Sequence, residues 1–299
     1  IIFKSSEKSP LGALAMGKLV VEAGFPPGVI NFISGGGETG HLLASHMDIN
    51  KIALLDLSNP EENNLKRVTL ELGGKSPSLI FNDADMETAL TQASQGFLVN
   101  SGQVCAAASR TFVQEGIAPQ FVEALKDKFE YFLHAMGDPL APNTFLGPLA
   151  DRIQFDRVMA FLEEGKKDAH VLTGGGRHGN KGNFIEPTIF LDPPTESKIY
   201  TDEIFGPVLV VKTFKTEAEV VELANDTSYG PAAYLYTSDI TRALRVSANL
   251  EAGSVFINGP FMPTINTPFG GLKQSGNGGR ESGKHGLMSY LEPKSILIK

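Results

Sequence analysis

The sequence predicts an α/β protein whose strands run mainly parallel. Short apolar segments of strand length alternate with longer segments in which apolar residues recur at helical spacing. Strands that alternate with helices pair in parallel, because each helix returns the chain to the starting edge of the sheet. The 299 residues are 41% hydrophobic, which is enough for a large core and for more than one domain.

The first part of the chain shows this alternation. Strand, helix, strand and helix patterns occupy residues 1–4, 9–24, 29–33 and 35–47. Ser9 and Pro10 predict the start of the first helix, because a hydroxyl caps the first turn and proline fits its first position. The glycines at 35–37 follow the second strand, where they either let backbone amides approach a phosphate or form a flexible turn. Both interpretations stay open, because a full dinucleotide fingerprint is missing.

The remainder of the chain continues as a second α/β part. A strand is predicted at 68–72, and a helical pattern begins near Asp85. Further helices are predicted at 119–135, 151–166, 217–225 and 240–250, and further strands at 110–113, 184–190, 208–213, 232–237, 254–258 and 294–299. The helix over 119–135 is strongly amphipathic, which indicates a core-facing side. The glycines at 174–176 indicate a turn, because no helix follows them.

Composition and charge argue against several classes of protein. The formal net charge is −8 and no basic run is interleaved with aromatic residues, so a nucleic-acid surface is not expected. Apolar runs stay shorter than a membrane span, and His, Cys, Asp and Glu do not occur at metal-ligand spacing, so we expect neither a membrane protein nor a metal site. A single cysteine suits a reducing compartment. We expect a cytoplasmic protein, and a targeting segment is not observable because the sequence does not begin with methionine.

The only cysteine, Cys105, is a candidate nucleophile. Most free cysteines are small buried apolar residues whose thiol takes part in no chemistry. Cys105, however, follows Asn100, Ser101 and Gly102 and precedes three alanines, so small side chains leave room for a substrate carbon. Backbone donors or a basic side chain beside the sulfur would lower its pKa from the usual value of about 8.5.

A second candidate is Glu71, which lies on the predicted strand VTLEL. Apolar residues alternate there with Thr69 and Glu71, as in a strand with one apolar face. An isolated glutamate at such a position is most often a solvated surface group. Gly73 and Gly74 follow, and glycines let the chain turn sharply or approach another backbone. A carboxylate at such a strand end can project into a cleft and take a proton from water, if burial raises its pKa.

Two segments around these residues resemble the active-site signatures of the NAD(P)-dependent aldehyde dehydrogenases. The first is ELGGKSP at residues 71–77. The second comprises Phe97, Gly102, Gln103, Cys105, Ala107 and Arg110. The separation of Glu71 and Cys105 agrees with the family, and similar motifs recur at 203–208 and 268–276. The chain therefore resembles the C-terminal portion of an aldehyde dehydrogenase, with a partial Rossmann-type cofactor domain and an α/β catalytic domain.

The resemblance implies the chemistry of the catalytic residues. Cys105 would attack an aldehyde, and Glu71 would activate the water that hydrolyses the resulting thioester. Glu281 matches a family residue that takes part in a proton relay. The segment 275–280 has one glycine more than the family usually shows, so we expect a shift of Glu281.

The resemblance also implies cofactor-binding residues. Lys4 and Glu7 match a pair that contacts the adenosine ribose, and a carboxylate there would accept from both ribose hydroxyls and repel a 2′-phosphate. NAD is therefore expected rather than NADP. The other implied cofactor residues are Gly73, Glu203 at the nicotinamide ribose and Phe205 beside the nicotinamide ring. Without the resemblance, Lys4 and Glu7 would be solvated loop charges and Glu203 a loop acid.

The resemblance divides the chain into a partial dinucleotide-binding domain over 1–73, a catalytic domain over 74–275 and a C-terminal segment over 276–299. The last of these ends in a strand that is expected to pair with another subunit of a homo-oligomer. Residues 54–64 are shorter and more acidic than the matching family segment, and they lack its Phe-Thr-Gly-Ser turn. The family's N-terminal part, with an Asn of the oxyanion hole, would precede Ile1, so Cys105 supplies a backbone donor alone.

Three functions remain open. The first is oxidation of a small aldehyde to a carboxylic acid with NAD(P)+. The second is a thiol esterase that needs no cofactor, because Cys105 can be acylated without hydride transfer. The third is a catalytically impaired relative that acts as an interaction protein through its C-terminal strand.

Overall fold

The chain divides between Val68 and Thr69 into two structural units. The computed structural model describes residues 1–55 and 66–298. Most of the short acidic segment singled out at 54–64 therefore lies outside the described residues. The division falls a few residues before the boundary predicted at residue 73, and the three-part division of the chain stays a prediction.

The first unit is a strand–helix–strand–helix array followed by a further strand. Its elements are β1 (Ile2–Ser6), α1 (Pro10–Glu22), β2 (Asn31–Gly35), α2 (Gly37–Ser45) and β3 (Lys51–Leu55). β1 and β2 pair in parallel from Ile2 opposite Asn31 to Ser6 opposite Gly35. Helix α1 starts at Pro10, as predicted, although the Ser9 side chain makes no capping hydrogen bond. Neither α1 nor α2 contains a buried residue.

Strand β4 (Arg67–Glu71) leads from one unit to the other. Its first residues belong to the first unit, where β4 pairs with β3. Its last residue, Glu71, lies in the second unit and forms an isolated antiparallel bridge with Gly276. The carboxylate singled out from the sequence therefore stands at a strand end, as the pattern predicted.

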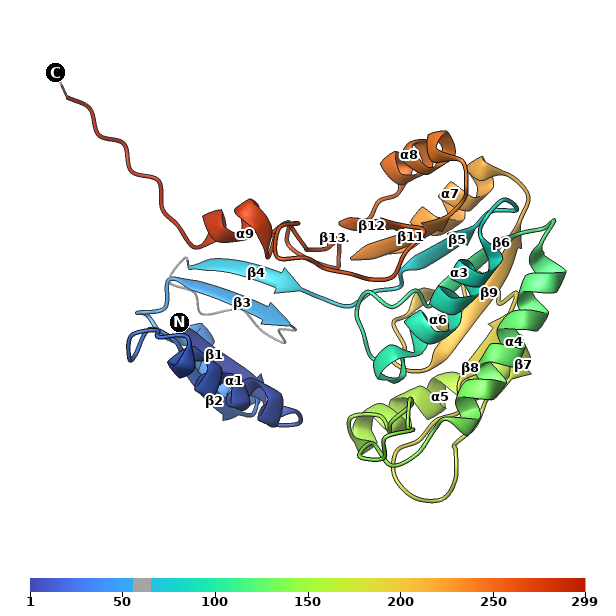
Figure 1. The fold of residues 1–299 in the computed structure, drawn as a ribbon, viewed down its shortest axis with the longest axis horizontal. Helices are drawn as coiled ribbons and strands as arrows, with labels where there is room; N and C mark the ends of the chain where they lie inside the picture. The colour runs from blue at the N-terminus through green and yellow to red at the C-terminus, as the bar shows by residue number, and fades with distance from the viewer. Residues whose placement is uncertain (56–65, 299) are drawn as a thin grey trace. The chain divides into compact units, whose positions relative to one another are not determined.

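A seven-stranded sheet organises the second unit (Figure 1). Its strands, in spatial order, are β12 (Ser254–Ile257), β11 (Ala232–Tyr236), β5 (Pro77–Ile80), β6 (Arg110–Gln114), β9 (Val208–Phe214), β8 (Thr188–Leu191) and β7 (His170–Thr173). Neighbouring strands are parallel except at β7 and β8. The predicted α/β fold with a mainly parallel sheet is confirmed. A short antiparallel pair, β10 (Tyr229–Gly230) with β13 (Leu272–Lys273), lies outside this sheet.

Two apolar clusters line the sheet because successive strand residues point to opposite faces. One cluster joins Tyr234 and Tyr236 of β11 to Phe121 and Phe129 of α4 (Ala118–His134) and to residues of α3 (Met86–Thr91). The other joins Leu235 of β11 to α5, α6, α7 and α8. These four helices span Arg152–Asp168, Lys198–Thr201, Glu217–Asn225 and Ile240–Asn249. The sheet is therefore covered by helices on both faces, as Figure 1 shows.

The C-terminal strand predicted at 294–299 does not form within the described part of the chain. After α9 (Gly283–Ser289), residues 291–298 form neither a helix nor a strand. Ile296, Leu297 and Ile298 are 75%, 95% and 92% exposed. The physical reason is that an edge strand exists only when another strand pairs with it, and the apolar pattern that suggested the strand does not supply that neighbour.

Candidate active site

The main chain after Glu71 is fixed by Ser275. The Ser275 hydroxyl donates to the carbonyl of Gly73 at 2.7 Å and accepts from the amide of Gly230 at 2.9 Å. The amide of Leu72 donates to the carbonyl of Ser275 at 2.9 Å. Ser275 is fully buried. These bonds hold the end of β4 in one position, so the Glu71 side chain projects from a fixed backbone.

The Glu71 carboxyl is partly buried, and its Oε1 atom is buried without a hydrogen-bond partner among the described residues. Burial and the negative charge of Glu281 raise the pKa of Glu71, and the positive charge of Arg280 lowers it. The net result is a pKa of about 7. Burial is the largest of these causes, because a carboxylate loses hydration when it is removed from water. A carboxyl group with a pKa near neutrality is suited to act as a general base.

The two glycines after Leu72 are needed because other groups approach them closely. A Cβ atom on Gly73 would overlap the carboxylate of Glu203. A Cβ atom on Gly74 would overlap the carbonyl oxygen of Cys105 and the ring of Pro231, and the amide of Gly74 donates to Glu203 Oε1 at 2.8 Å. The double glycine therefore brings the segment after Glu71 directly against Cys105 and Glu203.

The segment before Cys105 is more irregular than the single helix that the sequence predicted. Asp85 caps α3 by accepting from the amide of Thr88 at 2.8 Å, but α3 ends at Thr91 and passes into a π-helical turn over Gln92–Gly96. Asn100 and Ser101 then adopt left-handed φ angles of 54° and 56°. Such conformations persist only where surrounding contacts hold them.

Contacts on several sides hold this strained turn. The Ser101 hydroxyl donates to the carbonyl of Gly147 at 2.8 Å, and Gln103 Oε1 accepts from the amide of Ala150 at 2.9 Å. Gly102, with φ of 71°, lies so close to the carbonyl of Gly206 that a Cβ atom would overlap it. Cys105 is thereby presented from a fixed turn and not from a flexible loop.

The Cys105 thiol is partly buried. Burial raises the pKa of the thiol, and the negative charges of Glu203 and Glu71 raise it further, whereas the backbone amides of Ala106 and Cys105 lower it. The sequence suggested backbone donors beside the sulfur, and these are present, but the net shift of the pKa is upward because burial is the largest cause. The contacts of Gly73 and Gly74 with the Glu203 carboxylate and the Cys105 carbonyl place the end of β4, Cys105 and Glu203 in one region of the second unit.

Helix α5 holds the segment that carries Glu203 and Phe205. Arg157 donates to the carbonyl of Glu203 at 2.7 Å, and Gln154 donates to the carbonyls of Ile204 and Phe205 at 3.0 and 2.8 Å. Phe205 adopts a left-handed φ of 57°, a strained conformation for a side chain of this size. The helix thus fixes both residues that the resemblance assigned to the nicotinamide end of a cofactor.

Glu281 lies beside Glu71 in spite of the additional glycine before it. Its backbone pairs with Phe269, with mutual amide-to-carbonyl bonds of 2.7 and 2.8 Å. Its charge is one of the causes of the raised pKa of Glu71. The additional glycine therefore does not remove Glu281 from the neighbourhood of Glu71.

Lys4 and Glu7 lie in the first unit. Lys4 is on β1, where its ammonium donates to the carbonyl of Ser5 at 3.1 Å, and Glu7 is an exposed residue in the turn after β1. Because β1 and β2 are parallel, this turn shares a sheet edge with the glycines at 35–37. A Cβ atom on Gly40 in the first turns of α2 would lie 3.9 Å from the Lys4 side chain. The edge is therefore glycine-rich and carries both a cation and a carboxylate.

Lys75 is a residue of the site that the sequence reasoning quoted without assigning. Its side chain is fully buried, and its ammonium donates to the carbonyl of Asp202 at 2.6 Å. Burial is the largest cause that lowers the pKa of Lys75 to about 7, and Arg110 adds to it. The buried Arg110 also donates to the carbonyl of Lys75 at 2.9 Å. The available signal was a lysine two residues before the buried strand β5.

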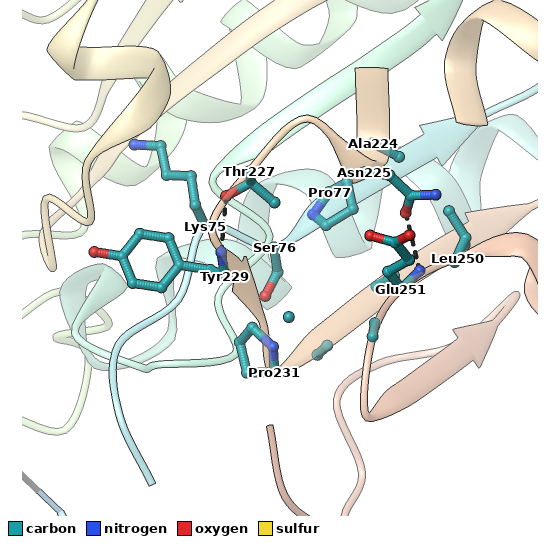
Figure 2. A pocket seen from close by; sticks show the side chains of 14 residues that line it. Lys75, Ser76, Pro77, Ala224, Asn225, Thr227, Tyr229, Pro231, Leu250 and Glu251 are labelled. Atoms are coloured by element: carbon teal, nitrogen blue, oxygen red, sulfur yellow. Dashed lines mark hydrogen bonds between the residues drawn. The ribbon is translucent and has the colours of Figure 1, made fainter. Parts of the chain in front are cut away.

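A small cavity lies behind this segment (Figure 2). Its volume is about 10 Å³, and Ser76, Pro77, Tyr229 and Pro231 line part of it. The Lys75 side chain extends away from Ser76 and Pro77 in Figure 2. A space of this size holds about one water molecule, so this cavity is not a substrate site.

Within residues 1–55 and 66–298, no group of three or more His, Cys, Asp or Glu residues is placed to bind a metal ion.

Comparisons with known proteins agree with this arrangement. The family model for the aldehyde dehydrogenase family matches residues 1–296. An aldehyde dehydrogenase of Emericella nidulans is 46% identical over 306 aligned residues, which cover 99% of this chain and 61% of that protein. Aldehyde dehydrogenase 1A1 of Mus musculus is 43% identical, with 100% and 61% covered.

Solved structures give the same result. The NAD+ complex of an aldehyde dehydrogenase from Bacillus cereus has a TM-score of 0.94 at 42% identity, and the match covers 99% of this chain and 62% of that one. An indole-3-acetaldehyde dehydrogenase in complex with NAD+ has a TM-score of 0.93 at 38% identity, with 100% and 62% covered. The chain thus spans about three fifths of the length of these relatives. By this match over almost its whole length, the chain belongs to the aldehyde dehydrogenase family.

Proposed function

We propose that this chain oxidises an aldehyde to a carboxylic acid with NAD+, with Cys105 as nucleophile and Glu71 as general base. The observation that carries the proposal is the convergence of the two groups. The main chain of Gly74 lies against the Cys105 carbonyl, and the charge of Glu71 acts on the thiol. A carboxyl group with a pKa of about 7 beside a thiol is able to take a proton from it at neutral pH.

The first chemical step belongs to Cys105. Its thiol loses a proton to a base, and the sulfur adds to the aldehyde carbon, so that the carbonyl oxygen becomes the oxyanion of a thiohemiacetal. The backbone amide of Cys105 is a donor for that oxyanion. When bound, NAD+ would supply the acceptor for the hydride of the thiohemiacetal carbon, and loss of this hydride would convert the adduct to a thioester.

The second step belongs to Glu71. In its ionised form it removes a proton from a water molecule, the resulting hydroxide adds to the thioester carbon, and the carbon–sulfur bond breaks. The products are the carboxylic acid and the thiolate of Cys105. Because the pKa of Glu71 is about 7, the ionised form predominates above neutral pH, and we expect hydrolysis of the thioester to accelerate as the pH rises through that value.

Each unit, taken by itself, carries residues suited to one part of a nicotinamide dinucleotide. In the first unit, α2 begins at Gly37 after Gly36, and neither glycine has an atom within 4 Å of where a Cβ would stand, so a phosphate can approach the backbone amides there. In the second unit, the Glu203 carboxylate and the strained Phe205 are held by α5. Lys4 and Glu7 are proposed for the adenosine ribose, and Gly73 for close approach of the nicotinamide end.

Glu7 is proposed to select NAD+ over NADP+. Its exposed carboxylate would accept from ribose hydroxyls and repel a 2′-phosphate. Glu7→Gln removes the charge and retains an acceptor, so we expect kcat/KM for NADP+ to rise by roughly tenfold relative to that for NAD+. An unchanged ratio of the two kcat/KM values would remove Glu7 from this role.

The direct test of the proposed function is aldehyde-dependent NADH formation by the full protein, followed by absorbance. Cys105→Ala should lower the rate by at least about a thousandfold, because no other group can form the adduct. Ser109→Ala, in the same turn but without loss of the thiol, is the matched control and should retain the parent rate. Undiminished oxidation by Cys105→Ala would refute the mechanism.

The same preparations separate the cofactor-independent alternative. Hydrolysis of p-nitrophenyl acetate by Cys105 without NADH formation from any aldehyde would favour the thiol esterase. Absence of both activities, together with no heat of binding on titration with NAD+, would favour the impaired relative that acts as an interaction protein.

Assembly and location are part of the proposal. We infer that the exposed tail over 294–298 pairs with a strand of a second copy, because its apolar residues are largely exposed and form no strand within the described chain. Removal of residues 294–299 should lower the mass measured by light scattering, and an unchanged mass would contradict the inference.

None of the helices in the described residues is long and apolar enough to cross a membrane. We place the protein in the cytoplasm because of its single cysteine, and cell fractionation tests this.

A further inference from the structure

A buried tyrosine lies beneath the proposed nucleophile. Tyr234 is the central residue of β11, where it stands opposite Ser78 of β5 on one side and Phe256 of β12 on the other. It is only 5% exposed. Its hydroxyl donates to the carbonyl of Ala106 at 2.8 Å, and Ala106 directly follows Cys105. The bond therefore joins the central sheet to the residue next to the thiol.

Ala106 connects the Tyr234 hydroxyl to the Cys105 thiol. Its carbonyl accepts from Tyr234, and its amide is one of the two backbone donors that act on the Cys105 sulfur. The residue is fully buried, so water does not compete for either group. The bond from Tyr234 fixes the peptide plane that follows Ala106, and only the φ and ψ angles of Ala106 separate this plane from the one that carries its amide.

The Tyr234 hydroxyl is itself fixed in position and in protonation. Its ring stacks on Phe256 with centroids 5.4 Å apart and an interplanar angle of 24°. Phe256 in turn contacts the ring of Phe261 edge to face at 5.5 Å. Burial raises the pKa of Tyr234, so its hydroxyl keeps its proton throughout the pH range in which a thiol titrates. Tyr234 is therefore a constant donor to Ala106.

We propose that Tyr234 is a positioning residue for Cys105: by holding the carbonyl of Ala106, its hydroxyl fixes the backbone next to the thiol in the conformation that favours the thiolate. This role rests on the proposed nucleophilic function of Cys105 and deepens it. Glu203 and Glu71 act against the thiolate, and the amides of Ala106 and Cys105 are the groups that favour it. If the amide of Ala106 turned away from the sulfur, the pKa of the Cys105 thiol would rise further.

The test is the pH dependence of thiol alkylation in Tyr234→Phe. Cys105 is the only cysteine, so the rate of carbamidomethylation by iodoacetamide reports this thiol alone. The substitution removes the hydroxyl and keeps the ring that stacks on Phe256. We expect the midpoint of the pH–rate profile to rise by roughly 0.5–1 unit, which slows alkylation about three- to tenfold below the midpoint. The limiting rate at high pH should stay at the parent value.

Tyr236→Phe is the matched control. Tyr236 lies two residues along the same strand, is 2% exposed and donates its hydroxyl at 3.3 Å to the carbonyl of Gly259, away from the Cys105 turn. Its loss should leave the alkylation profile unchanged. If both tyrosine variants shift the midpoint equally, a general loosening of the core explains the effect and the proposal is wrong.

A second variant keeps the proposal testable should Tyr234→Phe fold poorly. Ala106→Gly leaves Tyr234 intact and loosens the backbone of residue 106, so it should shift the midpoint in the same direction by a smaller amount. A parent-like midpoint in every variant that folds would overturn the proposal. The assay needs neither aldehyde nor NAD+, so its outcome is independent of whether the protein oxidises aldehydes.

Discussion

The two units of this chain differ in how their secondary structure is supported. In the first unit, α1 and α2 contain no buried residue. Three large apolar residues of α1, Leu11, Leu19 and Val21, are 80%, 59% and 76% exposed. In the second, Leu125 and Phe129 of α4 are fully buried against the seven-stranded sheet. The proposed catalytic pair belongs to the well-packed unit.

The difference shows which unit can hold side chains in fixed positions. A thiol and a carboxylate that exchange protons must be held within a few tenths of an ångström. The sheet and its helices supply that support, because closely packed interiors resist displacement. The unit with the proposed adenosine-binding edge has few buried apolar contacts of its own, and such regions open at lower cost in free energy.

The largest test of this contrast compares a buried and an exposed apolar residue. Phe129 is fully buried and stacks on Phe97 at 6.3 Å, so Phe129→Ala should lower the free energy of unfolding by about 3–5 kcal/mol. Leu19→Ala in α1 should change it by about 0.5 kcal/mol or less. Urea unfolding followed by circular dichroism measures both. Equal losses would show that Leu19 has a packing partner that the described chain does not contain.

Two glycine-to-alanine substitutions, one in each unit, compare how closely other atoms approach the backbone. In Gly74→Ala, the new methyl group would overlap the Cys105 carbonyl and Pro231, so we expect a loss of about 1–3 kcal/mol in unfolding free energy together with a large loss of activity. Gly12 lies within α1 with no atom within 4 Å of its Cβ position. Gly12→Ala should stabilise the chain by about 0.5–1 kcal/mol. A tolerated Gly74→Ala would contradict the close approach.

The smallest of these effects is a pH-dependent gain in stability for Glu71→Gln. The pKa of Glu71 is raised from 4.5 to about 7, so the folded state retains a proton that the unfolded state has lost between those values. This contribution is complete below pH 4.5 and is lost as the pH rises through 7. The variant should therefore be more stable than the parent by roughly 1 kcal/mol at pH 8.5, after a discount for solvent screening, and equal to it near pH 4. A constant difference across that range would exclude Glu71 as its source.

Local sequence signals predicted much of the fold. Helix α7 was predicted at its observed bounds of Glu217–Asn225, and a capping box between Thr216 and Glu219 marks its start. Strands β9 and β12 were predicted to within one residue at each end. Such signals act over a few neighbouring residues, so they can be read from the chain itself.

The parts that could not be predicted depend on residues distant in sequence. The tail over 294–298 shows the apolar pattern of a strand but pairs with nothing in the described chain. The buried Lys75 finds its acceptor in the carbonyl of Asp202, and Tyr234 reaches Ala106 because β11 lies beside β5. The upward shift of the Cys105 pKa likewise follows from burial and from two carboxylates on other segments.

The central claim is that Cys105 becomes acylated during aldehyde oxidation and that Glu71 releases the acyl group. Its most direct measurement is mass spectrometry of the peptide that contains Cys105, after Glu71→Gln protein has been mixed with an aldehyde and NAD+. We predict that this peptide carries the acyl group of the aldehyde as a thioester and that the parent protein shows little of it. NADH formation by the variant without any acyl adduct on Cys105 would contradict the account.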